Sequence, residues 1–221
     1  MDFAQGFFWP EPNAKVYYIE GNVGVGKSET MFELAELLRE THALTVACLP
    51  QKEEEWADKG LLAGTSSVEG TELFAVYGPL MDHVERAKYI EDQSENYDVI
   101  LVERHPSTTL EVFEHSTETM KLFHAVDAVS GLLRNPTHTI HLKNSPGVCY
   151  ARTKRRARVE DLTLDEAAFQ DFDHKHEEMV TKRLALGGNV YVSDALGADC
   201  HHHLVTSIAA SIGFNKPPSP M

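Results

Sequence analysis

Short apolar runs alternate with longer amphipathic stretches along most of the chain. The short runs are rich in Val, Ile, Tyr and Thr and predict strands at 16–20, 44–49, 98–102, 137–142 and 189–193. The stretches between them predict helices at 27–40, 71–95, 107–134, 146–158, 163–186 and 199–212. Strands separated by helices in this way form a parallel sheet with helices on both faces. We therefore expect an α/β fold with a five-stranded parallel sheet.

The length of 221 residues suits one domain of this kind, spanning 1–221. Residues 1–14, with two prolines and several aromatic side chains, are expected to form an N-terminal arm, and 214–221 a flexible tail. No apolar run reaches the ~20 residues of a membrane span, and the first residues lack the basic start of a secretion signal. The three cysteines are far apart, as is typical of reduced thiols. We expect a cytoplasmic protein that does not act at a membrane, with the nucleus or mitochondrion as alternatives.

The charge balance disfavours a nucleic-acid polymer as the partner. The chain carries 34 acidic and 20 basic residues, for a formal net charge of −14, and such a surface repels phosphate backbones. However, five of the basic residues fall within Arg152–Arg158. This cluster indicates either a localised anion, such as a nucleotide polyphosphate, or a solvated helix face.

The most informative motif follows the first predicted strand and opens the first predicted helix. It matches the phosphate-loop pattern G-x-x-x-x-G-K-[ST] at Gly21, Asn22, Val23, Gly24, Val25, Gly26, Lys27 and Ser28. The glycines allow backbone N–H groups to surround a β-phosphate, and the helix N-terminus adds a positive dipole end. Lys27 is expected to reach the β- and γ-phosphates, and the Ser28 hydroxyl to bind Mg²⁺. The unit predicts a site for a nucleoside triphosphate.

A charged pair ends the third predicted strand, at Glu103 and Arg104. Ligands of open α/β sheets collect at the carboxyl ends of the strands, so we expect both side chains to face the phosphate loop. Glu103 is a candidate ligand for Mg²⁺, and Arg104 a candidate contact for substrate oxygens. The alternative is a surface ion pair.

The basic cluster places Arg152 and Arg156 on one helix face, and Arg158 begins the next turn. Like charges at this spacing destabilise an isolated helix, so an anion is expected to compensate them. Arginines on a closing segment can neutralise a transferring phosphoryl group and exclude water. We therefore expect an arginine-rich lid at 152–162.

Together these motifs resemble the deoxyribonucleoside kinase family, which includes the herpesviral thymidine kinases. The glycine loop is similar down to Asn22, and "ERHP" is similar to the family's acid–Arg motif in its herpesviral form. "LKNSPGVCYARTKRRAR" (142–158) follows the family pattern L-x-x-S-P-x-V-x-Y-x-R-x-x-x-R-x-R without a gap. The resemblance extends from about Val16 to Val192 and is weak between 50 and 97.

The resemblance implies a P-loop kinase fold, usually dimeric, that transfers the γ-phosphate of ATP to a deoxyribonucleoside 5′-hydroxyl in nucleotide salvage. It implies ATP and Mg²⁺ as cofactors and thymidine as the first candidate substrate. By position, Ser28 and Glu103 match the metal side, and Arg104 matches the arginine near the 5′-oxygen. The family's lid cations match Arg152, Arg156 and Arg158, and Asp161 matches an acid on the sugar 3′-hydroxyl.

The acceptor side departs from the family pattern E-P-x-x-x-W. Trp56 is retained, but Gln51 lies where the general base is expected, so Glu53 is the first candidate for the base and Glu54 and Glu55 are alternatives. The family's base-reading Gln has no counterpart within 57–92. Tyr77, Asp82 and His83 are the candidate contacts for the nucleobase.

Two rival functions fit parts of the same pattern. A nucleoside monophosphate kinase needs further arginines for the acceptor phosphate, and the region 50–97 offers only Arg86. A nucleotide-binding module without turnover would explain the missing Glu at position 51.

Overall fold

Five parallel strands in the order β2-β3-β1-β4-β5 form the centre of the computed structural model. The structure describes residues 13–51, 71–112, 117–156, 164–194 and 198–212. The strands are β1 (Lys15–Glu20), β2 (Val46–Leu49), β3 (Val99–Glu103), β4 (His138–Lys143) and β5 (Asn189–Asp194). All five overlap the predicted runs, and the predicted five-stranded parallel sheet is confirmed.

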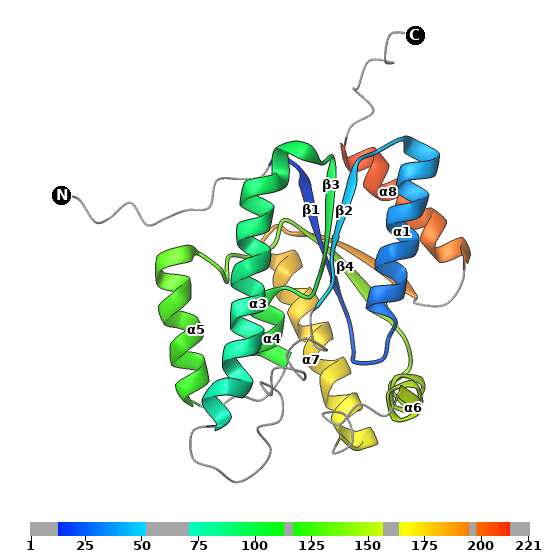
Figure 1. The fold of residues 1–221 in the computed structure, drawn as a ribbon. Coiled ribbons are helices and arrows are strands. Elements are labelled where there is room, and N and C mark those ends of the chain that lie inside the picture. The colour runs from blue at the N-terminus through cyan, green and yellow to red at the C-terminus, as the bar shows by residue number, and fades with distance from the viewer. Residues whose placement is uncertain (1–12, 52–70, 113–116, 157–163, 195–197, 213–221) are drawn as a thin grey trace, which may run out of the picture.

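Helices cover both faces of this sheet (Figure 1). One face carries α1 (Lys27–His42) and α8 (Ala198–Ile212), and the other carries α3 (Thr71–Gln93), α4 (Pro106–Val112), α5 (Thr117–Ser130) and α7 (Glu166–Ala185). A short 3-10 turn, η1 (Ser94–Asn96), follows α3, and α6 (Pro146–Arg156) lies at the end of the sheet where β1 stops. Among the described helices, none is both long and apolar enough to cross a membrane.

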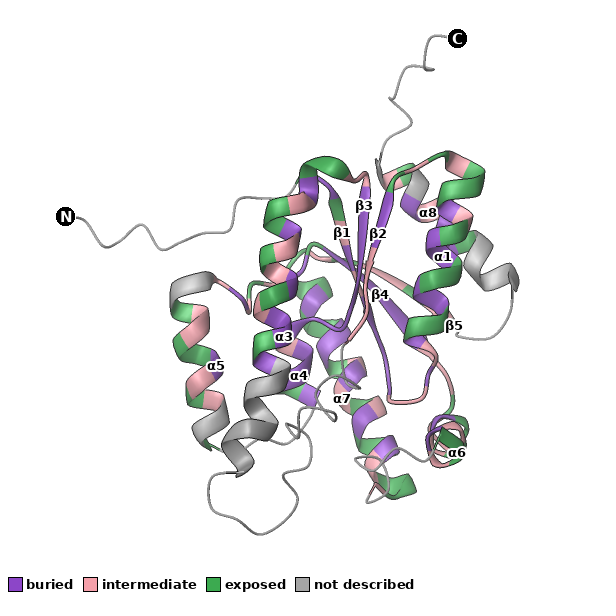
Figure 2. Cartoon of the chain, in the orientation of Figure 1, coloured by how far each residue is buried: buried purple, intermediate pink, exposed green. Residues whose placement is uncertain are grey.

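The alternation of side chains along the strands builds two cores, one on each face. Tyr17 and Ile19 of β1 pack toward α1 and α8, with Leu101 of β3 and Ile140 of β4. Val16 and Tyr18 point to the opposite face, as a strand with a period of two requires, and pack with Ile100, Val102 and Ile90. Figure 2 shows the result: β3 and β4 are largely buried and the edge strand β5 is partly exposed, whereas the helices bury mainly one side.

The single helix predicted at 107–134 is wrong. The structure has two helices there, α4 and α5, which pack against different neighbours: α4 contacts α7, whereas α5 contacts α3. No proline or glycine between 107 and 130 marks a break, so the pattern gave no signal for it. Gly131, with φ of 65°, ends α5 in the left-handed conformation that favours glycine.

Two buried histidines predict a dependence of stability on pH. His141 of β4 stacks on His176 of α7, and burial lowers the pKa of His141 to about 4 and that of His176 well below its usual value. The unfolded chain therefore binds more protons once the pH falls below about 6.5, and stability should fall by up to about 1.4 kcal/mol per pH unit for each histidine between pH 6.5 and 4. Urea unfolding at pH 7, 6 and 5 measures this slope.

His141→Asn should reduce that slope, whereas His124→Asn, which changes an exposed residue of α5, should leave it unchanged. Equal slopes for the wild type and the His141 variant would contradict the account.

Candidate active site

The loop between β1 and α1 has the backbone shape that phosphate binding requires. Gly21, Gly24 and Gly26 have φ of 138°, 75° and 106°, all in the region that favours glycine. Asn22 fixes the loop to the core, because its Nδ2 donates to the Phe169 carbonyl of α7 at 2.8 Å and its Oδ1 accepts from the Val23 N–H at 2.8 Å. The Asn22 side chain thus fixes the loop both to its own backbone and to α7.

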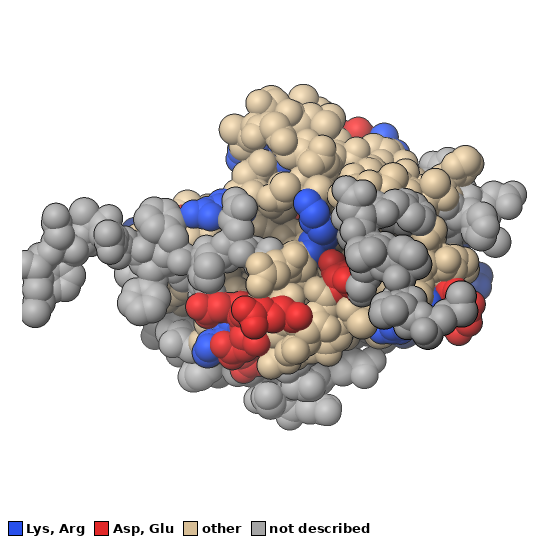
Figure 3. All heavy atoms as spheres, turned by 90° about the horizontal axis from the view of Figure 1, so that it is seen from above, with Lys and Arg blue, Asp and Glu red and all other residues tan. Residues whose placement is uncertain are grey.

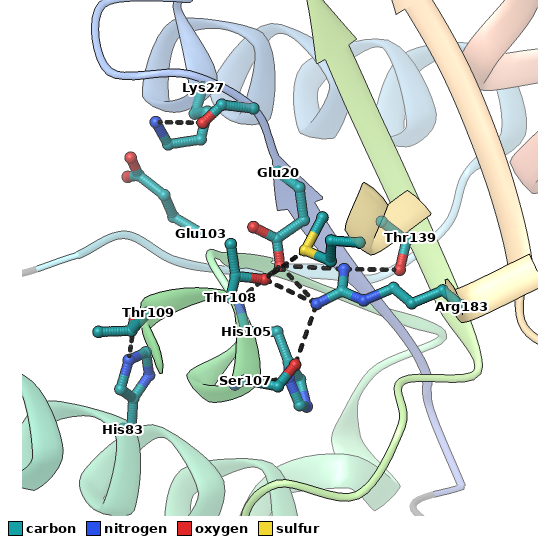
Figure 4. Close-up of polar contacts among 12 residues, drawn as sticks. Glu20, Lys27, His83, Glu103, His105, Ser107, Thr108, Thr109, Thr139 and Arg183 are labelled. Carbon is teal, nitrogen blue, oxygen red and sulfur yellow. Dashed lines mark hydrogen bonds and ion pairs between the residues drawn. The ribbon is translucent and has the colours of Figure 1, made fainter. Parts of the chain in front are cut away.

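Lys27 is the first residue of α1 and is 7% exposed. Its Nζ donates to the Asn22 carbonyl at 3.1 Å and to the Gly21 carbonyl at 3.4 Å. The ammonium therefore lies over the loop, beside the backbone that would surround a phosphate. Figure 4 shows the Lys27 and Glu103 side chains pointing toward one another.

The carboxyl ends of three strands meet at Glu103. Its Oε2 accepts from the Ser28 hydroxyl of α1 at 2.9 Å and from the Gln51 N–H, just after β2, at 3.3 Å. Glu103 itself is buried at 7% exposure. A carboxylate and a hydroxyl in contact are oxygen ligands of the kind that Mg²⁺ prefers. The two residues proposed for the metal therefore lie side by side.

Arg104 follows in an unusual conformation. Its φ is 62°, which is uncommon for a residue with a side chain, and its N–H donates to the Ile19 carbonyl at 3.0 Å. Strained backbone of this kind concentrates at functional sites. Glu103 faces the phosphate loop as expected, whereas Arg104 forms part of the wall of a cavity on the α3 side of the sheet.

The basic helix α6 lies against the phosphate loop. Its start is set by Ser145, whose hydroxyl accepts from the Val148 N–H at 3.4 Å, and by Pro146 at the first helical position. Arg152 Nη1 donates to the Val25 carbonyl at 3.3 Å, and Arg156 is exposed in the last turn. Of the two arginines, Arg152 contacts the loop directly.

Gly24 marks the closest approach between the loop and α6. A Cβ there would lie 2.4 Å from Thr153 Oγ1 and 2.6 Å from the Cys149 carbonyl oxygen. Gly24→Ala should therefore cost about 1–3 kcal/mol for overpacking in addition to the left-handed backbone cost of about 1–2 kcal/mol. Chemical denaturation measures the loss of stability.

Gly187→Ala is the matched control, because Gly187 has φ of 81° and nothing within 4 Å of its added Cβ. Equal destabilisation by the two substitutions would show that α6 does not press on the loop.

A buried ion-pair network lies behind the site and was missed by sequence reasoning. Glu20, at the end of β1, is fully buried, and its Oε1 accepts from the His105 N–H at 2.8 Å, from Thr108 Oγ1 at 2.7 Å and from both Nη atoms of Arg183 at 3.2 Å (Figure 4). Arg183 also donates to Thr139 Oγ1 at 3.1 Å. We call these five residues the Glu20 network.

The Glu20 network connects the structural elements that position the residues of the site. It links the strand before the phosphate loop, the turn after Glu103 and α7. The only sequence signals for it were a carboxylate at the end of an apolar run and an arginine among the apolar positions of a helix. Neither signal indicates which residue is the partner, because Glu20 and Arg183 are 163 positions apart in the sequence.

The remaining predicted residues are placed only in part. Glu53, Glu54, Glu55, Trp56, Arg158 and Asp161 lie outside the described residues. Tyr77 lies on α3, but its side chain is likewise outside them. The lid expected at 152–162 is described only to Arg156, at the end of α6.

Comparisons with known proteins bear on the family and the fold. A sequence model described as "Deoxynucleoside kinase" matches residues 17–208, most of the chain. Among solved structures, the deoxyadenosine kinase from M. mycoides with bound dATP is similar, with a TM-score of 0.59 and 20% identity over 87% of this chain and 97% of that one. No curated protein sequence matches. The structural likeness supports the fold, and the sequence match identifies the family. The chain belongs to the deoxynucleoside kinase family, whose members phosphorylate nucleosides.

Proposed function

We propose that the chain transfers the γ-phosphate of ATP to the 5′-hydroxyl of a deoxyribonucleoside, with thymidine as the first candidate acceptor. The observation that carries the proposal is the contact between Ser28 and Glu103 beside Lys27, at a phosphate loop with three glycines in the required conformation. Family membership supports the reaction class.

The donor side follows from the loop and its neighbours. Backbone N–H groups of Gly21–Ser28 surround the phosphates, and the Lys27 ammonium neutralises their charge. Ser28 and Glu103 would hold Mg²⁺, which would neutralise part of the charge of the phosphates. Because the loop is fixed through Asn22 and α7, little reorganisation is needed when the nucleotide binds.

The arginines of α6 and of the segment that follows it are proposed to stabilise the phosphoryl group during transfer. Arg152 lies next to the loop, with Nη1 3.8 Å from the position of a Cβ on Gly26. We propose that Arg152, Arg156 and Arg158 contact phosphate oxygens as the lid closes, where they stabilise the charge that spreads over the equatorial oxygens.

The acceptor side is proposed to rest on Glu53 as general base. The side-chain amide of Gln51 cannot accept the proton, and the backbone N–H of Gln51 donates to Glu103 Oε2. Glu54 and Glu55 are the alternatives. Arg104 would contact the 5′-oxygen, and Trp56 and Asp161 would contact the nucleoside.

Two of the three candidate contacts for the nucleobase already bond to other residues of the protein. His83 Nε2 bonds to Thr109 Oγ1 at 3.0 Å, and Asp82 pairs with Arg86 at 2.7 Å. Both His83 and Asp82 are about 2% exposed. We therefore propose Tyr77 as the contact for the nucleobase.

The rival function, a monophosphate kinase, would need arginines that can bind the phosphate of the acceptor. The single arginine of 50–97 is Arg86, which is 4% exposed and paired with Asp82. A homodimer, as is usual in the family, remains our proposal for the assembly, and light scattering of the purified protein tests it.

A panel of the four deoxynucleosides with ATP and Mg²⁺ tests the acceptor. We expect the highest kcat/KM for thymidine. The likeness to a deoxyadenosine kinase makes deoxyadenosine the second candidate, and a clear preference for it would overturn the thymidine assignment. Turnover with deoxythymidine monophosphate alone would favour the monophosphate kinase, and ATP binding without any turnover would favour the binding module.

Glu53→Gln should lower kcat by about 10²- to 10⁴-fold, because a positioned general base contributes that much. Gln51→Ala should change kcat only a few-fold, since its side chain has no proton-accepting role. Steady-state kinetics at saturating ATP measure both. If neither substitution slows transfer, the base lies elsewhere.

A further inference from the structure

A cavity of about 260 Å³ lies between the sheet and α3. Its floor is apolar and is formed by Val16 and Tyr18 of β1 and Val102 of β3, and Ala87 and Ile90 of α3 face this floor. The segment 131–138, which connects α5 to β4, completes the wall. All residues that line the cavity belong to the described part of the chain.

The cavity extends away from the phosphate loop. Lys15 and His138, at its outer end, are the first residues of β1 and β4, whereas the phosphate loop follows Glu20 at the last residue of β1. At about 3.3 Å per residue, β1 separates these ends by about 16 Å. Figure 3 views the molecule from the end where the strands begin; the largest group of charged side chains visible there is acidic, and other acidic and basic side chains are scattered over this face. The cavity is therefore distinct from the proposed donor site.

Positive charge predominates in the cavity wall. The lining includes the cationic side chains of Lys15, Arg86, Arg104 and Arg134, against one carboxylate, Glu91. Asp82 offsets part of the charge of Arg86 from outside the lining.

The titration of two lining histidines reflects this charge. The pKa values of His83 and His105 lie well below the usual range, first because of burial and next because of Arg86 and Arg183 respectively. Both rings are therefore neutral near pH 7, and the arginines remain the source of positive charge.

Nε of Arg86 is a buried donor of the lining with no hydrogen-bond partner among the described residues. Nδ1 of His138, which donates or accepts according to the tautomer of the ring, likewise has none there. Arg86 uses its other two nitrogens on the Glu103 carbonyl and on His83 Nδ1. Buried donors without a protein partner are rare in folded proteins, and each calls for an acceptor from water, an ion or a ligand. The Arg86 Nε–H suits an anionic oxygen as acceptor.

We propose that this cavity binds a small organic anion, in which one carboxylate or phosphate group meets the arginines and an apolar body of about ring size covers Val16, Tyr18 and Val102. The positive charge of the wall matches the anionic group, the Arg86 Nε–H can donate to that group, and the apolar floor matches the body of the ligand. The site is additional to those for the phosphate donor and the nucleoside acceptor.

The inner end of the cavity reaches the turn proposed for the acceptor side. Arg104 and His105 form part of its wall, and the His105 ring also bonds to the backbone of Arg134. An anion that holds Arg104 in the cavity wall would keep it from the 5′-oxygen. Occupancy is therefore expected to lower kcat, a consequence that rests on the proposed function, whereas binding itself does not.

Calorimetric titration of the full chain with benzoate, and with benzamide as the neutral isostere, tests the proposal. We expect saturable binding of benzoate at least about tenfold tighter than that of benzamide, since only the anion gains charge-assisted hydrogen bonds. Saturating ATP should not displace it, and saturating thymidine, which shares only Arg104 with it, should weaken its binding without abolishing it. Binding of benzoate no tighter than that of benzamide, or complete displacement by either substrate, overturns the proposal.

Three variants locate the bound benzoate. Ala87→Leu adds bulk to the wall and should abolish binding, and Arg134→Gln removes an exposed cation of the rim and should weaken it several-fold without threatening the fold. Lys88→Gln is the matched control, because Lys88 is on the same helix but its side chain is 61% exposed and outside the lining. Wild-type affinity in both Ala87→Leu and Arg134→Gln would place the benzoate elsewhere and overturn the assignment.

Benzoate should also lower kcat for thymidine in the wild type and not in Ala87→Leu. Equal inhibition of the two proteins would contradict the link between the cavity and Arg104, while the titration separately decides whether the cavity binds an anion.

Discussion

Replacing Lys27 by methionine is expected to lower kcat for phosphoryl transfer by about 10²- to 10³-fold, the usual cost of losing one preorganised donor to a charged transition state. Lys27 lies over the loop backbone, with Nζ 3.1 Å from the Asn22 carbonyl, and so is already in place for the phosphates. Methionine keeps much of the length of the side chain without its charge. Initial rates at saturating ATP and nucleoside measure the effect.

Lys88→Met provides the control, since Lys88 is exposed on α3 and, within the described part of the chain, pairs with its neighbours Glu91 and Asp92. Its kcat should match the wild type. A Lys27→Met protein that stays folded and retains kcat within threefold would show that the loop does not hold the transferring phosphate.

The second large effect is expected on stability, from Arg183→Met in the Glu20 network. The substitution leaves the Glu20 carboxylate fully buried without its cation, and such a loss typically costs about 3–5 kcal/mol. Urea or guanidinium unfolding measures the free energy. A double variant, Glu20→Leu with Arg183→Met, should recover part of the loss because no uncompensated charge remains.

Lys182→Met is the control on the same helix. Lys182 pairs with Glu111 at 2.6 Å, but its side chain is 58% exposed, so the pair should contribute less than about 1 kcal/mol. If the Arg183 single variant and the double variant were equally destabilised, the buried charge would not be the cause.

The order and type of the elements were predictable because the strands are short, apolar and separated by amphipathic helices. The strands at Lys15–Glu20 and His138–Lys143 each lie within one or two residues of the expected bounds. The phosphate loop was predictable because its chemistry is local: glycines and a lysine at fixed spacing serve one backbone turn. The contact between Ser28 and Glu103 followed from the rule that ligands collect at the carboxyl ends of strands.

What the sequence could not predict depends on contacts between distant residues. Glu20 and Arg183 are 163 positions apart, and no local pattern pairs them. Likewise, the sequence between 107 and 130 has no proline or glycine to predict that α4 and α5 are separate helices. Their separation comes from packing, since α4 contacts α7 and α5 contacts α3. The engagement of His83 with Thr109, which removes it from the candidate base contacts, is also visible only in three dimensions.

The central claim is the transfer of the ATP γ-phosphate to the 5′-hydroxyl, and product analysis tests it most directly. The protein is incubated with ATP, Mg²⁺ and thymidine, and in parallel with 5′-deoxythymidine, and the products are followed by phosphorus NMR and chromatography. We predict that ADP and thymidine 5′-monophosphate form in equal amounts, and that 5′-deoxythymidine gives no product. ADP formation at the same rate without nucleoside, or a phosphate on any hydroxyl other than the 5′, would contradict the account.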